Sequence, residues 1–194
     1  GRPADGACQP MTLMFEIAGA GGYEQKDTAE LHTRLEEAIA RAGLDVELPF
    51  GRVNYAPWII ALPRADAAVV QATHVYRVNA LDARDLTRAT VEARRQAHDL
   101  ARVLRHVPGF EGVRVTHGAS AIGVREGRRI RGRHVLDLED LRAGRRFDDA
   151  VTFCKFGVDI LDPERSGGAK TAHHTPIRPY EIPYGSLVPV DLRG

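Results

Sequence analysis

The longest periodic stretch in this sequence puts one long amphipathic helix at the centre of the fold. Between residues 86 and 107, apolar residues recur every three or four positions, which is the repeat of a helix that buries one face. Arg and Glu fill many of the other positions, and Pro108-Gly109 ends the helix. The apolar positions are Leu86, Ala89, Ala93, Ala97, Leu100, Leu104 and Val107. This should be the longest helix, and we expect its Leu/Ala stripe to pack on a sheet.

A second helix is predicted over residues 28–42. Asp27 occupies the N-cap position, and Glu30 stands three residues later, which is the spacing of a capping box. Gly43 follows as a natural helix stop. Apolar side chains recur every four residues, at Leu31, Leu35 and Ile39.

Short apolar runs between and after these helices predict strands. The expected strands cover residues 11–18, 58–62, 68–78, 112–117, 121–126, 158–161 and the start of a last one at 186–190. A short helix over 138–143 has Asp137 as its cap and Gly144 as its stop. Residues 162–185 are Pro-rich and predict an ordered loop. The sequence therefore predicts an α+β fold, with a mixed, largely antiparallel sheet and helices on one face.

Charge and apolar content exclude some classes of partner. With 27 basic and 26 acidic residues, the chain lacks the basic excess of a sequence-independent nucleic-acid binder or a polybasic membrane anchor. The longest apolar run, Trp58 to Leu62, is too short to span a bilayer. Cys8 and Cys154 form no metal-binding pattern and fit a reducing cytoplasm, so we expect neither a metal nor a disulfide.

A glycine-rich turn, Gly19-Ala20-Gly21-Gly22, follows the first strand and loosely resembles a dinucleotide-binding turn. A GxGxxG pattern needs a glycine at position 24, which is Glu24. The expected helix cap, Asp27, lies too far on for the glycines to stand at the helix N-terminus. A simple turn that ends the strand is therefore favoured.

An arginine-rich segment over residues 123–133 is the main candidate binding element. Arg guanidinium groups bind carboxylates and phosphates through two parallel hydrogen bonds. In an extended chain, Arg125 would share one face with Arg129, Arg131 and Arg133, and Glu126 would share the other with Arg128. The alternatives are a solvated charged strand, or a non-catalytic module that binds RNA or an anionic partner. No aromatic pattern flanks the segment, as a single-strand RNA platform would require.

Two further motifs carry weaker signals. His173 and His174 point apart in an extended chain and do not form a metal pair, but one His, or Tyr184, could transfer protons. The alternative is a histidine pair in a surface loop. Gly118-Ala119-Ser120 is similar to a nucleophile elbow, but the second glycine is replaced by Ile122, which argues against a serine hydrolase.

Several segments, in order and spacing, resemble one known family. They are LDARDLTRATVEARR (81–95), VPGFE (107–111), IGVREGRRI (122–130), HVL (134–136) with Glu139-Asp140, FDDA (147–150) and YEIPYGSLVP (180–189). Together they are similar to FAD-dependent oxidoreductases that carry an IGxRESRRIxG segment, a branch of the glutathione-reductase-like flavoproteins. The resemblance covers residues 81–190 and is looser over 10–80.

The resemblance implies FAD as the cofactor and two-electron or hydride transfer between a small organic substrate and flavin. In such flavoproteins a FAD-binding domain precedes the substrate-side domain, and the chain returns to it afterwards. We therefore expect residues 1–10 to be a linker or frayed end, 11–190 to be the substrate-binding domain, and 191–194 to begin the return. The FAD-binding domain of the same protein would be the partner, and this chain alone should be inactive and bind FAD weakly.

The resemblance also implies site residues. Arg125 would be a fixed cation near the flavin or a substrate anion, Arg128 would be the second choice, and Glu126 would orient either arginine. His174 and Tyr184 would be the proton-transfer candidates. The cofactor-binding set would be Arg125, Glu126, Tyr184 and Ser186. Gly127 and Gly185 depart from the family pattern, where Ser or Thr and Arg are usual, so the resemblance implies no substrate class.

Overall fold

The structure is a computed structural model that describes residues 8–20, 23, 28–50, 57–64, 66–158, 160–161 and 177–191. The chain divides into two compact units. Unit 1 contains residues 1–127 and 161–169, and unit 2 contains residues 128–160 and 170–194. Each unit is described by itself.

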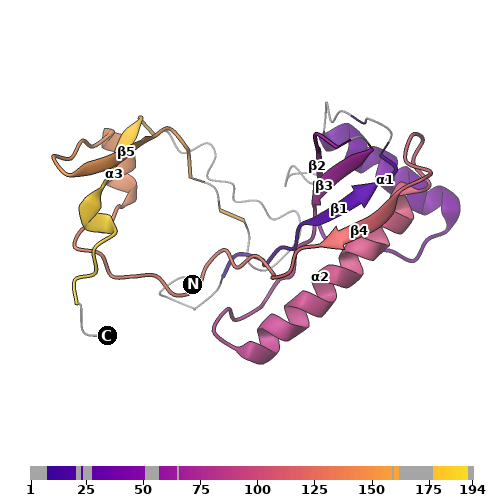
Figure 1. Cartoon of the computed structure of the whole chain (residues 1–194), viewed down its shortest axis with the longest axis horizontal. Helices are drawn as coiled ribbons and strands as arrows, with labels where there is room; N and C mark the ends of the chain where they lie inside the picture. The colour runs from indigo at the N-terminus through magenta and orange to yellow at the C-terminus, as the bar shows by residue number, and fades with distance from the viewer. Residues whose placement is uncertain are drawn as a thin grey trace. The chain divides into compact units, whose positions relative to one another are not determined.

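Unit 1 is a layer of two helices on a four-stranded antiparallel sheet (Figure 1). Its elements are β1 (Phe15–Ala18), α1 (Thr28–Ala42), β2 (Trp58–Ala61), β3 (Ala67–Gln71), α2 (Ala83–Leu104) and β4 (Arg114–Gly118). The strand order is β2-β3-β1-β4, so β1 pairs with both β3 and β4 at the centre. This βαββαβ order with an antiparallel sheet is the ferredoxin-like arrangement.

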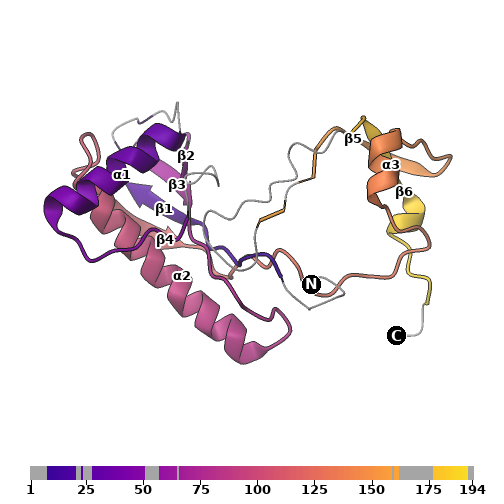
Figure 2. The same ribbon diagram turned by 180° about the vertical axis from the view of Figure 1, so that it is seen from behind.

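The core of unit 1 lies between the sheet and its helices, which cover the same face (Figure 2). Strand β1 shows the cause, because Phe15 and Ile17 are buried whereas Glu16 between them points to the opposite face. The predicted α+β fold, with an antiparallel sheet and helices on one face, is confirmed.

Helix α2 is the longest described helix, as predicted, and its Ala/Leu stripe is buried. Leu100 is only 2% exposed. The helix begins three residues earlier than expected because the Asp82 side chain accepts hydrogen bonds from the N–H groups of Arg84 and Asp85. Asp82 therefore fixes the start of the helix before its apolar stripe begins.

Unit 2 is small and contains few buried side chains. Its elements are α3 (Leu138–Ala143), β5 (Ala150–Cys154), β6 (Tyr180–Pro183) and the 3₁₀ turn η3 (Tyr184–Ser186). Strands β5 and β6 form a two-stranded antiparallel sheet. The predicted limits of α3 are confirmed, because Asp137 forms a capping box with Asp140 and Gly144 ends the helix at a φ of +63°.

The prediction of a strand over residues 121–126 was wrong. Gly123 alone pairs, through one isolated bridge to Thr12, and the chain bends at residues 125–127. The arginine side chains after it therefore do not alternate along a strand. The apolar side chains of this segment do not share one buried face, because Ile122 packs against the core whereas Val124 is 45% exposed.

The strands expected at 158–161 and 186–190 were also wrong. The Leu161 N–H donates to the side chain of Gln9 at 2.8 Å instead of joining a sheet. Residues 184–186 form the 3₁₀ turn, and Pro189, which has no N–H, makes only an isolated bridge to Gly132.

The boundaries of the remaining strands also differ from the sequence analysis. The expected strands at 11–18 and 68–78 are shorter, at 15–18 and 67–71. Strand β5 was not predicted, and β6 occupies part of the expected Pro-rich loop. Most of β5 is exposed on both faces, so it has no inward and outward alternation that sequence patterning would detect.

Candidate functional site

Arg125 lies in unit 1, just after the bridge that joins Gly123 to Thr12. Two backbone hydrogen bonds hold that bridge: Thr12 N–H donates to Gly123 O at 3.1 Å, and Gly123 N–H donates to Thr12 O at 2.6 Å. The Arg125 side chain is exposed, and in the described part of the chain it has no hydrogen-bond or ion-pair partner. Its guanidinium is therefore available to an external anion.

His74 is the titratable group that the structure places near Arg125. Its side chain is buried, and burial is the main cause that lowers its pKa to about 4. A contact between Nδ1 and the Ala72 carbonyl, at 3.0 Å, works in the opposite direction, and the positive charge of Arg125 lowers the pKa further. His74 is therefore neutral at neutral pH and stacks on Tyr76 at a ring-centroid distance of 6.1 Å.

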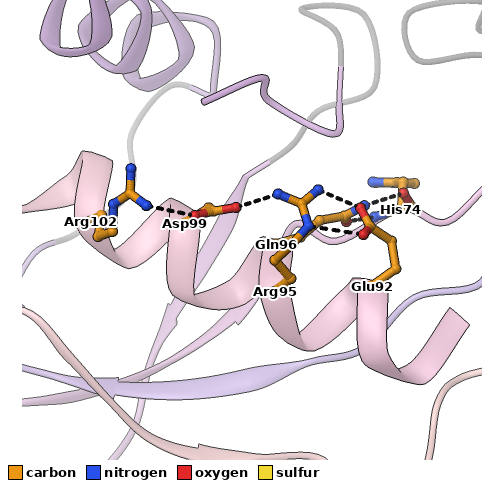
Figure 3. Close-up of polar contacts among 6 residues, drawn as sticks. All are labelled: His74, Glu92, Arg95, Gln96, Asp99 and Arg102. Carbon is orange, nitrogen blue, oxygen red and sulfur yellow. Dashed lines mark hydrogen bonds and ion pairs between the residues drawn. The ribbon is translucent and has the colours of Figure 1, made fainter. Parts of the chain in front are cut away.

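The backbone of His74 is held by the side chain of Gln96 from α2 (Figure 3). The His74 N–H donates to Gln96 Oε1 at 2.9 Å, and Gln96 Nε2 donates to His74 O at 3.0 Å. Gln96 Nε2 also donates to Glu92 Oε1 at 3.0 Å. The Arg95 side chain in turn donates to both oxygens of Glu92, at 2.7 and 3.0 Å. This chain of contacts fixes the position of His74 from the helix.

Glu126, which was expected to orient an arginine, instead anchors an early segment of the chain. Its Oε2 accepts a hydrogen bond from the Gln9 N–H at 2.9 Å. No ion pair joins Glu126 to Arg125 or Arg128 in the residues that the structure describes. Arg128 is exposed and belongs to unit 2, and His174 lies outside the described residues.

Tyr184 and Ser186 both belong to η3 in unit 2. The Tyr184 side chain is 58% exposed, and its backbone N–H donates to Asp149 O at 2.8 Å. The Gly185 N–H donates to Asp149 Oδ2 at 2.8 Å. Ser186 Oγ is buried and has no hydrogen-bond partner. The structure thus brings Tyr184 and Ser186 together, on a turn fixed by Asp149.

Next to this turn lies a His–Asp pair that the sequence analysis missed. The His134 N–H donates to Gly185 O at 3.1 Å, and His134 Nε2 lies 2.9 Å from Asp140 Oδ2. Burial of Asp140 would raise its pKa, but the hydrogen bonds from His134 and the Asp137 N–H and the charge of Arg145 lower it overall. Asp140 is therefore an acceptor only.

Because Asp140 accepts, we assign a proton to His134 Nε2. The His134 side chain is 31% exposed. A carboxylate hydrogen-bonded to an imidazole orients the ring, as it does where a histidine transfers protons. The sequence held one indication of this pair, because Asp140 stands at the third position of a predicted helix, six residues after His134.

Metal binding finds no support in this part of the chain. The described residues contain no group of three or more His, Cys, Asp or Glu side chains placed to hold a metal ion. None of the described helices is long and apolar enough to cross a membrane.

The N-termini of α2 and α3 do not fit the pyrophosphate of FAD. Such a group binds where free N–H groups and the helix dipole favour an anion. At α2 these N–H groups already donate to Asp82, and Asp85 adds a second carboxylate in the first turn. At α3, Asp137 and Asp140 form the capping box. Carboxylates at both positions would repel a phosphate.

The described part of the glycine turn after β1 is packed against backbone. Gly19 has a φ of +84°, and a Cβ at this position would lie 2.1 Å from Gly112 O. This glycine therefore permits a close approach of two chain segments. The N-termini of α2 and α3 thus do not supply a site for the pyrophosphate of FAD.

Comparison with known proteins identifies the family. The family model described as FAD dependent oxidoreductase matches residues 1–194, the whole chain. No curated protein and no solved structure gives a match. The narrower likeness to glutathione-reductase-like flavoproteins stays a prediction. The expected family and its FAD cofactor are confirmed: the chain belongs to the FAD-dependent oxidoreductases.

Proposed function

We propose that this chain is the substrate-side part of a FAD-dependent oxidoreductase that transfers two electrons, as hydride, between a small organic substrate and flavin. The proposal rests on the difference between the family match and the chemistry of two helix N-termini. The family match spans the whole chain, yet the described helix N-termini of α2 and α3 are closed by carboxylates. The adenosine diphosphate part of FAD is then held by a FAD-binding domain of the same protein.

The surface of unit 2 supports docking on such a domain. A two-stranded sheet is marginally stable by itself, and soluble proteins rarely expose large apolar patches. Unit 2 nevertheless exposes many large apolar side chains: Ile130, Val135, Leu138, Val151, Phe153, Phe156, Ile160, Tyr184, Leu187 and Val190. These side chains need cover that the described residues of unit 2 do not provide, and we assign that cover to the FAD-binding domain.

Within this function, Arg125 is our first candidate for the group that binds a substrate anion or the flavin. Among the described residues its guanidinium has no hydrogen-bond or ion-pair partner, and it acts electrostatically on the buried, neutral His74. A fixed cation stabilises developing negative charge without a proton transfer. Tyr184 and His174 are proposed for proton transfer. Arg128, Glu126 and Ser186 are proposed as further groups that bind substrate or cofactor.

The first test compares FAD binding by residues 1–194 alone and by the same chain joined to a FAD-binding domain. Fluorescence titration with FAD should give no saturable binding to the chain alone, and stoichiometric binding to the joined polypeptide. The joined polypeptide should also show flavin reduction by an organic substrate. Tight, stoichiometric binding of FAD to the chain alone would refute the proposal.

The second test replaces Arg125 by Lys in the joined polypeptide. Lys keeps the charge but loses the two-pronged donor geometry of Arg. If Arg125 contacts a developing anion, turnover should fall by about 10²–10³-fold. Arg114→Lys, an exposed arginine on β4, is the matched control and should leave turnover within about twofold of wild type. Equal turnover of the two variants, with flavin bound in both, would remove Arg125 from the site.

A further inference from the structure

A cavity of about 310 Å³ lies in unit 1 between α2 and the β4 end of the sheet. It is separate from the contacts that hold His74. Its apolar lining comes from Leu13, Phe15 and Val115. Leu13 and Phe15 are almost fully buried, at 1% and 2% exposure, so the floor of the cavity belongs to the rigid core. Its volume is at the lower end of the range for small-molecule sites.

Two small residues keep this cavity open. Ala97 on α2 fills little of the space above the sheet. Gly118 at the end of β4 has no side chain, and a Cβ there would meet only one atom within 4 Å, Leu13 Cδ2 at 3.9 Å. The φ of Gly118 is not positive, so its backbone would accept another residue. The hollow therefore results from side-chain size and can be filled by mutation.

Two unpaired basic side chains, Arg94 and His98, lie beside the apolar floor. They stand four residues apart on α2, so they lie on the same side of the helix. Both are exposed, and within the described structure neither makes a hydrogen bond or an ion pair.

The other flank of α2 is different, because its charges neutralise one another (Figure 3). Arg95 pairs with Glu92 at 2.7 Å and with Asp99 at 2.6 Å, and Arg102 pairs with Asp99 at 3.1 Å. The unpaired positive charge of this part of the helix is thus concentrated at the cavity.

We propose that this cavity binds a small organic carboxylate with an apolar body. Arg94 would hold the carboxylate through its guanidinium fork, and an N–H of His98 would donate a further hydrogen bond. The apolar body would lie on Val115 and over Gly118, above the buried Leu13 and Phe15. The inference rests on the proposed function in one respect, because it takes the organic acid to be a substrate or effector of the proposed oxidoreductase.

The test is a titration of residues 1–194 with sodium hexanoate, followed by calorimetry and by amide chemical shifts. Wild type should bind hexanoate saturably, with shifts confined to α2, β4 and residues 13–15. Arg94→Gln should weaken binding at least about tenfold, because it removes a charge-assisted hydrogen-bond pair. Arg84→Gln removes the same charge from the first turn of α2, away from the cavity, and should bind like wild type.

Gly118→Val is the second variant, and it should abolish hexanoate binding by filling the cavity while the fold is retained. Hexanamide, which lacks the charge, and inorganic phosphate, which lacks the apolar body, should both bind much more weakly than hexanoate. The inference is overturned if hexanoate does not bind saturably, if Arg94→Gln and Arg84→Gln bind equally, or if phosphate binds as tightly as hexanoate. If the joined polypeptide has no flavin-dependent turnover with any organic substrate, the proposed function is refuted. The hexanoate result does not depend on that outcome.

Discussion

Replacing Gly19 by Ala should destabilise unit 1 for two separable reasons. The first is backbone conformation, because the φ of Gly19 is +84°, a region that L-residues rarely adopt. The second is space, because a Cβ at this position would lie 2.1 Å from the oxygen and 2.4 Å from the carbon of the Gly112 carbonyl. Those are backbone atoms, which cannot rotate away as a side chain can.

A matched control separates the two reasons. Gly43 also has a positive φ, +60°, but a Cβ there would meet nothing within 4 Å. An L-residue at positive φ costs about 1–2 kcal/mol. Replacing Gly by Ala also restricts the unfolded chain. This stabilises the folded state by about 0.4–1 kcal/mol and offsets part of that cost. Gly43→Ala should therefore lower the free energy of unfolding by about 0.5–1 kcal/mol. Gly19→Ala adds overpacking, about 1–3 kcal/mol, and should lower it by about 1.5–4 kcal/mol.

The assay is urea unfolding of both variants and wild type, followed by circular dichroism. The midpoint should shift while the slope stays constant, because the surface exposed on unfolding is the same. If Gly19→Ala costs no more than Gly43→Ala, the close approach to Gly112 is not what requires glycine there. If Gly19→Ala leaves stability unchanged but weakens FAD binding in the joined polypeptide, the turn is part of a dinucleotide site and our interpretation of it is wrong.

Three further predictions test the core, the buried histidine and unit 2. Leu100→Ala should lower the free energy of unfolding by about 2–5 kcal/mol, because Leu100 is 2% exposed. Val91 on the same helix is 66% exposed, so Val91→Ala should change this free energy by less than about 0.5 kcal/mol. Thermal unfolding of both variants measures the difference. The pKa of His74 falls from 6.5 to about 4 on folding, so the unfolded state binds more protons between these values and stability should drop as the pH falls through this window, by at most about 1.4 kcal/mol per unit. His74→Gln should remove that pH slope in urea unfolding between pH 6.5 and 5, and His106→Gln, at an exposed position, should keep it. Asp140→Asn should accelerate amide hydrogen exchange in α3, because it weakens the capping box and the contact with an imidazole; exchange at the wild-type rate would contradict this.

The helices could be predicted from the sequence because their determinants are local. Residues 28–42 carry an apolar period, and Asp137 and Gly144 mark the two ends of the helix over 138–143. Strand pairing is different, because it depends on partners far along the chain. The β1–β4 pair joins residues about 100 positions apart, and no short window of sequence contains that information.

The residues of the candidate site also differ in whether the sequence alone could identify them. The family-like segment led directly to Arg125, but the burial of His74 and its contact with Gln96 depend on two segments that are 22 residues apart. One signal was available in the sequence. Gln96 stands beside Ala93 and Ala97 on the buried stripe of α2, and a polar side chain at a core position requires a hydrogen-bond partner. His134 gave a weaker signal, because only the folded turn brings it to Asp140.

The two leading arginine candidates differ in how firmly the fold holds them, and this difference favours Arg125. Arg125 lies between Gly123, which makes two backbone hydrogen bonds to Thr12, and Glu126, whose carboxylate accepts the Gln9 N–H at 2.9 Å. Its backbone is thereby tied on both sides to unit 1, which contains the apolar core. Arg128 belongs to unit 2, and among the described residues no hydrogen bond of its side chain is recorded. A cation stabilises a developing anion most when its position is fixed before the reaction begins. Arg128→Lys should therefore reduce turnover of the joined polypeptide less than Arg125→Lys does, and the reverse order would show that the site is built on unit 2.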